Sequence, residues 1–474
     1  GSEMCIRDRV YTMPEFLERR YNPQSRTILS VISLVSYVLT KVAVTVYAGG
    51  LVFQQVFGIK ELWGIDFFWI AAIGLVVLTA LYTIFGGMKS VLYTSVLQTP
   101  ILLLGSLIIL VLGFKELGGW DEMMRVCGAV TVNDYGDTMT NLIRSNDDAN
   151  FPWLGALIGS AIIGFWYWCT DQFIVQRVLS GKNEMEARRG TIFGAYLKLL
   201  PVFLFLIPGM IAFALHQKYI GAGGEGFLPM LANGTANADA AFPTLVAKLL
   251  PAGVKGLVVC GILAALMSSL ASLFNSSAML FTIDFYKRFK PETPEKKLVG
   301  IGQIATIVIV VLGILWIPIM RSVGDVLYTY LQDVQSVLAP GIAAAFLLGI
   351  CWKRTSAQGG MWGLISGMVI GLTRLGAKVY YSNAGEVADS TFKYLFYDMN
   401  WLFFCGWMFL FCIIVVIVVS LATEAPTAEK IQGLVFGTAT KEQKAATRAS
   451  WNHWDIIHTV IILAITAAFY WYFW

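Results

Sequence analysis

Long apolar runs recur along the whole chain and are separated by shorter polar stretches. Most of these runs reach 18 residues, which is enough for a helix to cross about 30 Å of hydrocarbon. Ten-residue strands of alternating polarity are absent, and helices satisfy their own backbone groups in lipid. The pattern therefore predicts an all-α polytopic membrane protein. Its eleven predicted spans cover residues 27–56, 65–85, 90–114, 153–178, 189–216, 254–284, 299–320, 326–351, 360–381, 401–423 and 454–474.

Composition and charge agree with this prediction. The chain is 57% hydrophobic and 14% charged, whereas soluble domains carry about 25% charged residues. With residues 1–26 in the cytoplasm, and charges near the ends of spans counted with the adjacent side, 21 of the 34 Lys and Arg residues are cytoplasmic and 11 lie outside. The other two, Lys41 and Lys198, lie within spans. This bias supports the orientation and accounts for the net charge of +4 without a nucleic-acid partner.

The beginning of the chain has an unusual composition. "GSEMCIRDR" contains no apolar stretch and so is not a signal peptide. We interpret residues 1–10 as an adapter-derived scar, and "VYTMPEFLERRYN" as a cytoplasmic loop that enters a helix. We therefore expect residues 11–474 to form a single transmembrane domain whose sequence starts in mid-protein.

Three of the charged residues inside predicted spans stand out: Lys41, Asp171 and Lys198. A charge at the centre of a membrane helix costs about 2.5–3.5 kcal/mol on insertion scales, so each is a functional candidate. The alternatives are structural. Either lysine can extend toward an interface or form an ion pair, and Asp171 can cap or pair at a helix end.

The stretch "ALMSSLASLFNSSAMLF" is apolar but rich in serine. Ala265, Ser268, Ser269, Ser272 and Ser276 follow helical spacing and share one face. Small residues on one face allow close helix packing. Alternatively, the hydroxyls of Ser268 and Ser269, with a carbonyl near Ala265, supply part of an oxygen shell for Na⁺, as in the midplane sites of secondary transporters.

A second group of residues suits a polar solute. "WYWCTDQ" contains Tyr167 and Trp168, and Gln332 lies in "YTYLQDVQ". Aromatic faces stack on the C–H surface of a ring, while amide, ammonium and phenol groups bond its hydroxyls. Aromatic residues also simply fill helix-bundle cores, so the pattern alone leaves both interpretations open. No CxxC pair, phosphate-binding loop or nucleophile elbow is present and the three histidines are scattered, so we expect no enzyme activity.

At this point the sequence resembles a known family. "YTMPEFLERRYN", "WYWCTDQFIVQR", "YLKLLPVFLFLIPGM" and "GVKGLVVCGILAALMSSLASLFNSSAMLFTIDFYK" are similar to the sodium/solute symporters, within the sodium/glucose and sodium/galactose branch. The resemblance implies a leucine-transporter-like fold with inverted repeats. Full-length members have about three further helices before "YTMPEF", so the chain is expected to lack its first helices.

The resemblance also implies roles for individual residues. Ala265, Ser268 and Ser269 correspond to sodium-site positions; Tyr167 stacks beneath the sugar and, with Tyr328, forms gates. Lys198, Gln332, Lys41 and Trp168 belong to the sugar site, and Ser95 and Asp171 belong to the ion path. Many relatives carry Asp where this chain has Ser95, and two-sodium members carry Thr where it has Ala271, so one sodium per sugar is expected.

The expected function is therefore sodium-coupled symport of a glucose- or galactose-like sugar by alternating access. Na⁺ is the co-transported ion, and no organic cofactor is expected. The expected location is the plasma membrane, in bacteria the inner membrane. Two alternatives stay open: a symporter of another solute, such as myo-inositol, an anion or an amino acid, and a sugar-sensing or channel-like membrane protein.

Overall fold

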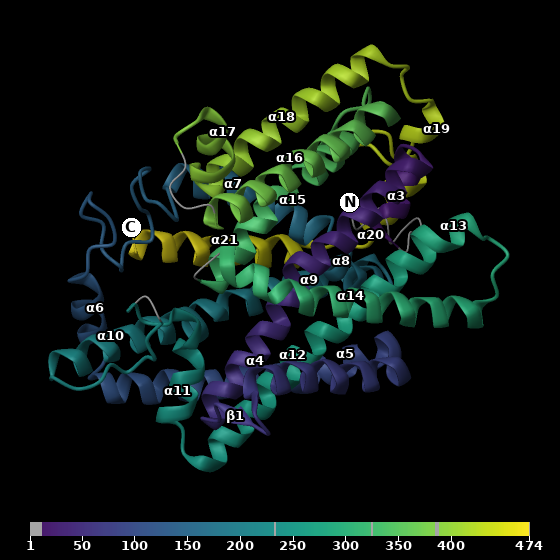
Figure 1. Ribbon diagram of the computed structural model, residues 1–474. Helices are drawn as coiled ribbons and strands as arrows, with labels where there is room; N and C mark the ends of the chain where they lie inside the picture. Colours follow the sequence, from purple (N-terminus) through teal and green to yellow (C-terminus); the bar gives the residue numbers. More distant parts are fainter. Residues whose placement is uncertain (1–11, 232–233, 324–325, 384–387, 474) are drawn as a thin grey trace. The chain divides into compact units, whose positions relative to one another are not determined.

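The computed structural model describes residues 12–231, 234–323, 326–383 and 388–473, most of them in helices (Figure 1). The exceptions include a short antiparallel hairpin, in which β1 (Glu61–Leu62) pairs with β2 (Ile65–Asp66). The predicted scar at residues 1–10 lies outside the described residues. The chain divides into two compact units, each described here by itself.

Unit 1 comprises residues 1–41, 146–194 and 276–463. Its main helices are α2 (Met13–Arg20), α3 (Pro23–Ser36), α7 (Trp153–Cys169), α8 (Gln172–Leu179), α14 (Glu295–Val323), α15 (Leu327–Cys351), α16 (Ala357–Asn383) and α18 (Trp401–Ala422). Shorter elements are η4 (Leu280–Tyr286), α13 (Lys287–Phe289), α17 (Thr391–Lys393), η5 (Tyr394–Asp398), α19 (Ala428–Ile431) and α20 (Lys441–Ala449).

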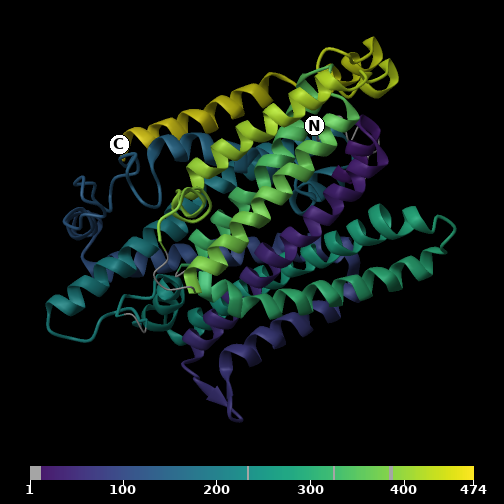
Figure 2. The ribbon, with the colours of Figure 1, turned by 45° about the horizontal axis from the view of Figure 1, so that its top comes forward.

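Helix α15 is the centre of unit 1. It packs against α16, α18 and α7, and Figures 1 and 2 show α15, α16 and α18 running side by side. Close approach depends on glycine, because a Cβ on Gly341 would lie 2.9 Å from the Cα of Gly367 in α16. Phe346 of α15 stacks on Phe16 of α2 at a centroid distance of 5.8 Å. The resulting apolar core holds α2, α7 and α15 together.

Unit 2 comprises residues 42–145, 195–275 and 464–474. It contains α4 (Ala43–Phe57), α5 (Phe67–Leu117), α6 (Trp120–Gly128), η2 (Val202–Leu206), α10 (Ile207–Gly221), η3 (Ala238–Ala240) and α11 (Ala241–Leu249). Its core gathers buried residues of α5, α10 and α11, including Ile109, Ile211 and Leu245. The residues of α9 (Glu184–Pro201), α12 (Ala252–Met279), α21 (His453–Tyr472) and the π-helical η1 (Tyr37–Val42) are divided between the two units.

Helices occupy all eleven predicted span positions, which confirms the all-α membrane architecture. Among the described residues, eight helices are long and apolar enough to cross a membrane, or nine when the bent pair α7–α8 counts as one span. Two details of the prediction were wrong. The two spans predicted at 65–85 and 90–114 lie on one continuous helix, α5, and the span predicted at 153–178 is broken, with a bend of 46° between α7 and α8.

Both differences have local causes. A glycine in a helix costs about 1 kcal/mol relative to alanine, so the pair Gly86–Gly87 does not by itself end a helix with apolar sequence on both sides. By contrast, Asp171 starts a new helix, because its side chain accepts the backbone N–H of Phe173 as an N-cap.

Candidate functional site

Lys41 is the last residue of unit 1 in this part of the chain and lies in the π-helical turn η1. The turn η1 follows α3 directly and contains one extra residue per turn compared with an α-helix. Such turns often mark functional positions. The Lys41 side chain points into the unit and is only 7% exposed, so its charge needs a partner.

Asp171 is that partner. The Lys41 ammonium is bonded to Oδ2 of the Asp171 carboxylate, whose side chain is 2% exposed. The other carboxylate oxygen accepts the Tyr37 hydroxyl at 3.2 Å and the Phe173 N–H at 3.2 Å. Tyr37 in turn accepts a second bond from the Phe173 N–H, at 3.0 Å. The pair thus joins the π-helical turn to the break between α7 and α8.

Aromatic rings surround the Lys41 ammonium. Its nitrogen lies 4.4 Å from the centroid of Phe173, 4.7 Å from Tyr37, 5.6 Å from Tyr167 and 5.8 Å from Trp166. These distances permit cation–π attraction, which strengthens when water is excluded. We call Lys41, Asp171 and these four rings the lysine cage.

In the lysine cage, Lys41 and Asp171 adopt the structural roles that the sequence left open as alternatives to a functional role. Lys41 forms an ion pair, and Asp171 both pairs and caps a helix. A direct sugar contact by Lys41 and an ion-path role for Asp171 stay predictions. Tyr37, which sequence analysis missed, lies four residues before Lys41; that spacing was the available signal.

Tyr167 and Trp168 differ in their surroundings. Tyr167 is half-buried beside the lysine cage, whereas Trp168 is 51% exposed. Their rings meet edge to face, with centroids 5.3 Å apart. Tyr167 is therefore the better placed of the two for stacking within a partly closed site.

The predicted residues of α15 lie at its first turns. Gln332 is half-buried and Tyr328 is 56% exposed. Between them lies Tyr330, which sequence analysis missed: its hydroxyl donates to the Leu39 carbonyl at 2.9 Å and accepts the Trp316 indole N–H at 2.6 Å. Tyr330 thus connects α15 to the π-helical turn that carries Lys41.

Two further charged clusters of unit 1 were also missed. Asp333, next to Gln332, pairs with Lys378 and lies 3.7 Å from the buried Arg374 guanidinium. Asp284 is fully buried and accepts bonds from Arg26 at 2.8 Å and from the Thr12 hydroxyl at 3.0 Å. All of these pairs join residues far apart in sequence, so no local pattern indicated them.

The serine face lies on α12, as predicted. Ser268 and Ser272 are buried, and Ala265 and Ser269 are half-buried. The Ser272 hydroxyl donates to the Ser268 carbonyl at 2.9 Å. The Ser268 hydroxyl instead meets the hydroxyl of Ser95 on α5, at 2.7 Å. Two residues that were predicted separately, for the sodium site and for the ion path, are thus in direct contact within unit 2.

Lys198 lies near the end of α9 and is exposed. It belongs to unit 2, whereas Lys41, Tyr167 and Gln332 belong to unit 1. That these residues line one sugar site stays a prediction.

Comparison with known proteins decides the family. The family model described as "Sodium:solute symporter family" matches residues 2–367, more than half of the chain. The chain belongs to the sodium:solute symporter family. This membership confirms the resemblance noted in the sequence, and the family consists of transporters rather than enzymes.

Two curated members give the degree of similarity. The sodium/mannose cotransporter of Bos taurus is 35% identical over 486 residues, which cover 98% of this chain and 80% of that protein. The sodium/myo-inositol cotransporter 2 of Homo sapiens is 35% identical over 445 residues, which cover 91% of this chain and 65% of that protein. The chain thus spans about two thirds to four fifths of the length of these relatives.

A solved structure supports the fold. A structure described as the substrate-bound outward-open state of a Na⁺-coupled sialic acid symporter aligns with a TM-score of 0.68 and 20% identity. The alignment covers 90% of this chain and 80% of that one. The likeness confirms the predicted symporter fold.

The prediction that Ser268 binds sodium puts a geometric condition on its contact with Ser95. Oxygens bound to one hard cation at about 2.4 Å, at right angles, are about 3.4 Å apart. The two hydroxyls are 2.7 Å apart, so a Na⁺ ion that uses both oxygens must first separate them. Uncharged hydroxyls can make that exchange at low cost, because each loses one hydrogen bond and gains an ion contact.

Proposed function

We propose that the chain carries the transport machinery of a sodium-coupled sugar symporter that works by alternating access in the plasma membrane, which in a bacterium is the inner membrane. Membership of the sodium:solute symporter family is the observation that carries this proposal. The buried hydroxyl of Ser268 supports the sodium part, because it offers a neutral oxygen ligand to a hard cation. The hydrogen-bonding and aromatic groups of Gln332 and Tyr167 support a polyhydroxy solute.

The driving force is sufficient for one sodium per sugar. Moving one charge across about 100 mV yields about 2.3 kcal/mol, and each 1.4 kcal/mol corresponds to a factor of ten. The potential alone thus supports roughly 50-fold accumulation. Sodium binding must favour the outward-open state and sugar binding must favour closure, since a ligand shifts only those states that it binds with different affinity.

We propose a ratio of one sodium per sugar. A second sodium site would need more oxygen ligands near Ser95 and Ala271. Ser95 offers a hydroxyl without formal charge, and the fully buried Ala271 offers no side-chain oxygen. A cation in such a partly dry place faces a large desolvation cost.

Counterflow in liposomes tests the function. The protein is expressed from its complete coding sequence, purified and reconstituted with unlabelled D-glucose or D-mannose inside, and uptake of the labelled sugar is followed with sodium and with potassium outside. We expect saturable counterflow that depends on sodium. A sensor would give no uptake of label, and a channel would equilibrate the label without counterflow. Either result would contradict the proposal.

myo-Inositol is the strongest alternative solute, because one relative is named for it. The same assay with labelled myo-inositol, and with each hexose as a competitor, shows whether the protein prefers myo-inositol or a hexose. Preference for an anion or an amino acid would leave sodium symport in place but would reject the sugar assignment.

A further inference from the structure

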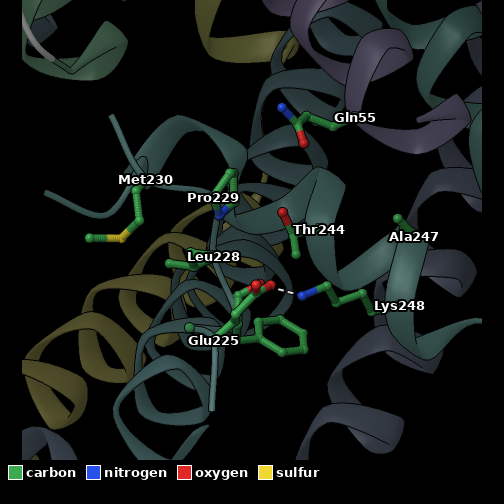
Figure 3. A pocket seen from close by; sticks show the side chains of 10 residues that line it. Gln55, Glu225, Leu228, Pro229, Met230, Thr244, Ala247 and Lys248 are labelled. Carbon is green, nitrogen blue, oxygen red and sulfur yellow. Dashed lines mark hydrogen bonds between the residues drawn. The ribbon is translucent and has the colours of Figure 1, made fainter. Parts of the chain in front are cut away.

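Unit 2 contains a pocket that none of the predicted transport residues lines. It has a volume of about 500 Å³ and lies between the segment 225–230, helix α11 and Gln55 at the end of α4 (Figure 3). That volume is within the range of small-molecule sites, about 300–1,000 Å³.

Three contacts fix the wall formed by residues 225–230. His216 of α10 accepts the Leu228 N–H at 3.0 Å, and the Lys248 ammonium of α11 donates to the Phe227 carbonyl at 2.7 Å. The Pro229 carbonyl accepts the backbone N–H of Asn237 at 2.8 Å. The wall is thus tied to both neighbouring helices, and the pocket is preformed.

Glycine is required where this wall meets α10. A Cβ on Gly226 would lie 2.2 Å from a carbon of the His216 ring. The close approach lets His216 reach past Gly226 to the Leu228 N–H. The shape of the wall therefore follows from the local sequence.

Thr244 points to a ligand. Its side chain is on α11 and lines the pocket, and the residue is only 5% exposed. Its hydroxyl has no hydrogen-bond partner among the residues that the structure describes. Buried hydroxyls are nearly always bonded, and leaving one unpaired costs free energy. Figure 3 shows this hydroxyl directed into the space that Gln55 also faces.

The buried polar groups of the pocket are uncharged. Thr244 offers a hydroxyl and the half-buried Gln55 offers an amide. A ligand hydroxyl can donate to one of these groups and accept from the other. The two charged residues, Glu225 and Lys248, are exposed and of opposite sign, and the Lys248 ammonium is already bonded to the Phe227 carbonyl and lies 4.7 Å from the Phe227 ring.

The apolar part of the lining complements these groups. Leu228, Pro229 and Ala247 present hydrocarbon surface to the pocket. A sugar or cyclic polyol has C–H faces for such a surface and hydroxyls for Thr244 and Gln55. A charged ligand would find no buried counter-charge.

We propose that this pocket is an accessory binding site for a monosaccharide-sized polyhydroxy compound, with Thr244 and Gln55 bonding its hydroxyls. None of the predicted transport residues Lys41, Tyr167, Lys198 and Gln332 is among the residues that line it. It does not rest on the proposed sugar transport, because a symporter of another solute could still carry it.

Equilibrium binding to the purified protein tests the proposal. Labelled D-mannose and myo-inositol are the probes, in potassium buffer without sodium. We expect saturable binding that falls about fivefold in affinity in Thr244→Val, the effect of losing one hydrogen bond between uncharged groups. Gln55→Leu should act similarly. Thr79→Val is the matched control, because the buried Thr79 hydroxyl already donates to its own helix at Leu75, and it should leave binding unchanged.

Two further variants separate this pocket from the transport site. Ala247→Trp fills the pocket and should abolish sodium-free binding while sparing sodium-dependent binding. Gln332→Ala should instead weaken sodium-dependent binding and leave sodium-free binding unchanged. The inference is overturned if wild-type protein shows no saturable binding without sodium, if Gln332→Ala alone removes that binding, or if Thr244→Val and Gln55→Leu leave it intact. Stronger binding of glycine than of either polyol would reject the proposed ligand class. Thermal unfolding of each variant identifies any that fail to fold, and the two conservative variants suffice if Ala247→Trp does.

Discussion

The lysine cage of unit 1 and the contact between Ser95 and Ser268 in unit 2, called the serine contact below, accommodate polar groups in a membrane protein in different ways. In the lysine cage, full charges neutralise each other: Lys41 binds Asp171, and four rings surround the ammonium. In the serine contact, Ser95 and Ser268 share one hydrogen bond between neutral hydroxyls. Disrupting the lysine cage costs much free energy, whereas disrupting the serine contact costs little.

This difference suits the lysine cage to a structural role and the serine contact to the binding and release of an ion. Removing one partner of a buried ion pair leaves an uncompensated charge, so the lysine cage is suited to hold the broken helix α7–α8 in place through many cycles. A hydroxyl pair can give up its bond to a passing cation. Function in ion transport is therefore better assigned to the weaker contact, and the following experiments test that assignment.

The largest effect is expected in the lysine cage. Lys41→Met or Asp171→Asn should lower the free energy of unfolding by about 3–5 kcal/mol, because each leaves one buried charge alone. The double variant should recover most of that loss, since Asn can still cap α8. Thermal unfolding of the purified protein measures all three. Unchanged stability of the single variants would show that the pair carries no structural load.

The double variant also isolates the predicted sugar contact of Lys41. If Lys41 only supports the fold, Lys41→Met with Asp171→Asn should bind sugar like the wild type. A stable double variant that has lost sugar affinity would instead assign Lys41 to the sugar site.

The predicted sugar residues should give the next largest effect. Gln332→Ala should weaken sugar binding by roughly 1–3 kcal/mol, because a half-buried hydrogen-bonding group is lost. Lys198→Ala should act in the same direction but less, since Lys198 is exposed. Tyr167→Ala should be severe and Tyr167→Phe mild, because stacking needs the ring and not the hydroxyl. Wild-type sugar affinity in both Gln332→Ala and Lys198→Ala would place the site elsewhere.

Within the serine contact, the two partners should behave oppositely. Ser268→Ala removes a proposed ligand and should raise the half-saturating sodium concentration about tenfold, in line with about 1.5 kcal/mol for a contact to a charge. Ser95→Ala leaves the ligand and removes its competitor, so the half-saturating concentration should stay equal or fall slightly. Sodium-dependent uptake in liposomes measures both. An equal increase in the two variants would show that both oxygens bind the ion.

The smallest expected change is in stoichiometry. Ser95→Asp, alone or with Ala271→Thr, adds oxygen ligands and a negative charge beside Ser268 and should raise the coupling ratio above one or slow sodium release. The reversal potential of sugar-induced current reports the ratio. A wild-type ratio near two would reject the one-sodium proposal, and no change in either variant would argue against a role of this position.

The helices and the serine face could be predicted because both depend on local patterns. Apolar length fixes a span, and the spacing of Ser268 and Ser272 fixes a face, so the structure confirms both. The contacts that join Lys41 to Asp171, and Ser95 to Ser268, could not be predicted, because their partners are 130 and 173 residues apart. The break before α8 could have been predicted from the sequence, since an aspartate followed by an apolar helix is an N-cap signal.

The π-helical turn at Tyr37–Val42 makes the position of Lys41 sensitive to the residue count. Its hydrogen bonds span five residues where an α-helix spans four, so the turn holds one residue more than a regular helix would in the same place. Deleting one residue there would allow a regular helix to form, and the helices on both sides could keep their orientation. The residues of the turn itself, Tyr37 and Lys41 among them, would change their spacing, although no residue of the cage had been substituted. A single-codon deletion in this turn should therefore disturb the lysine cage without reorienting the helices on either side of it.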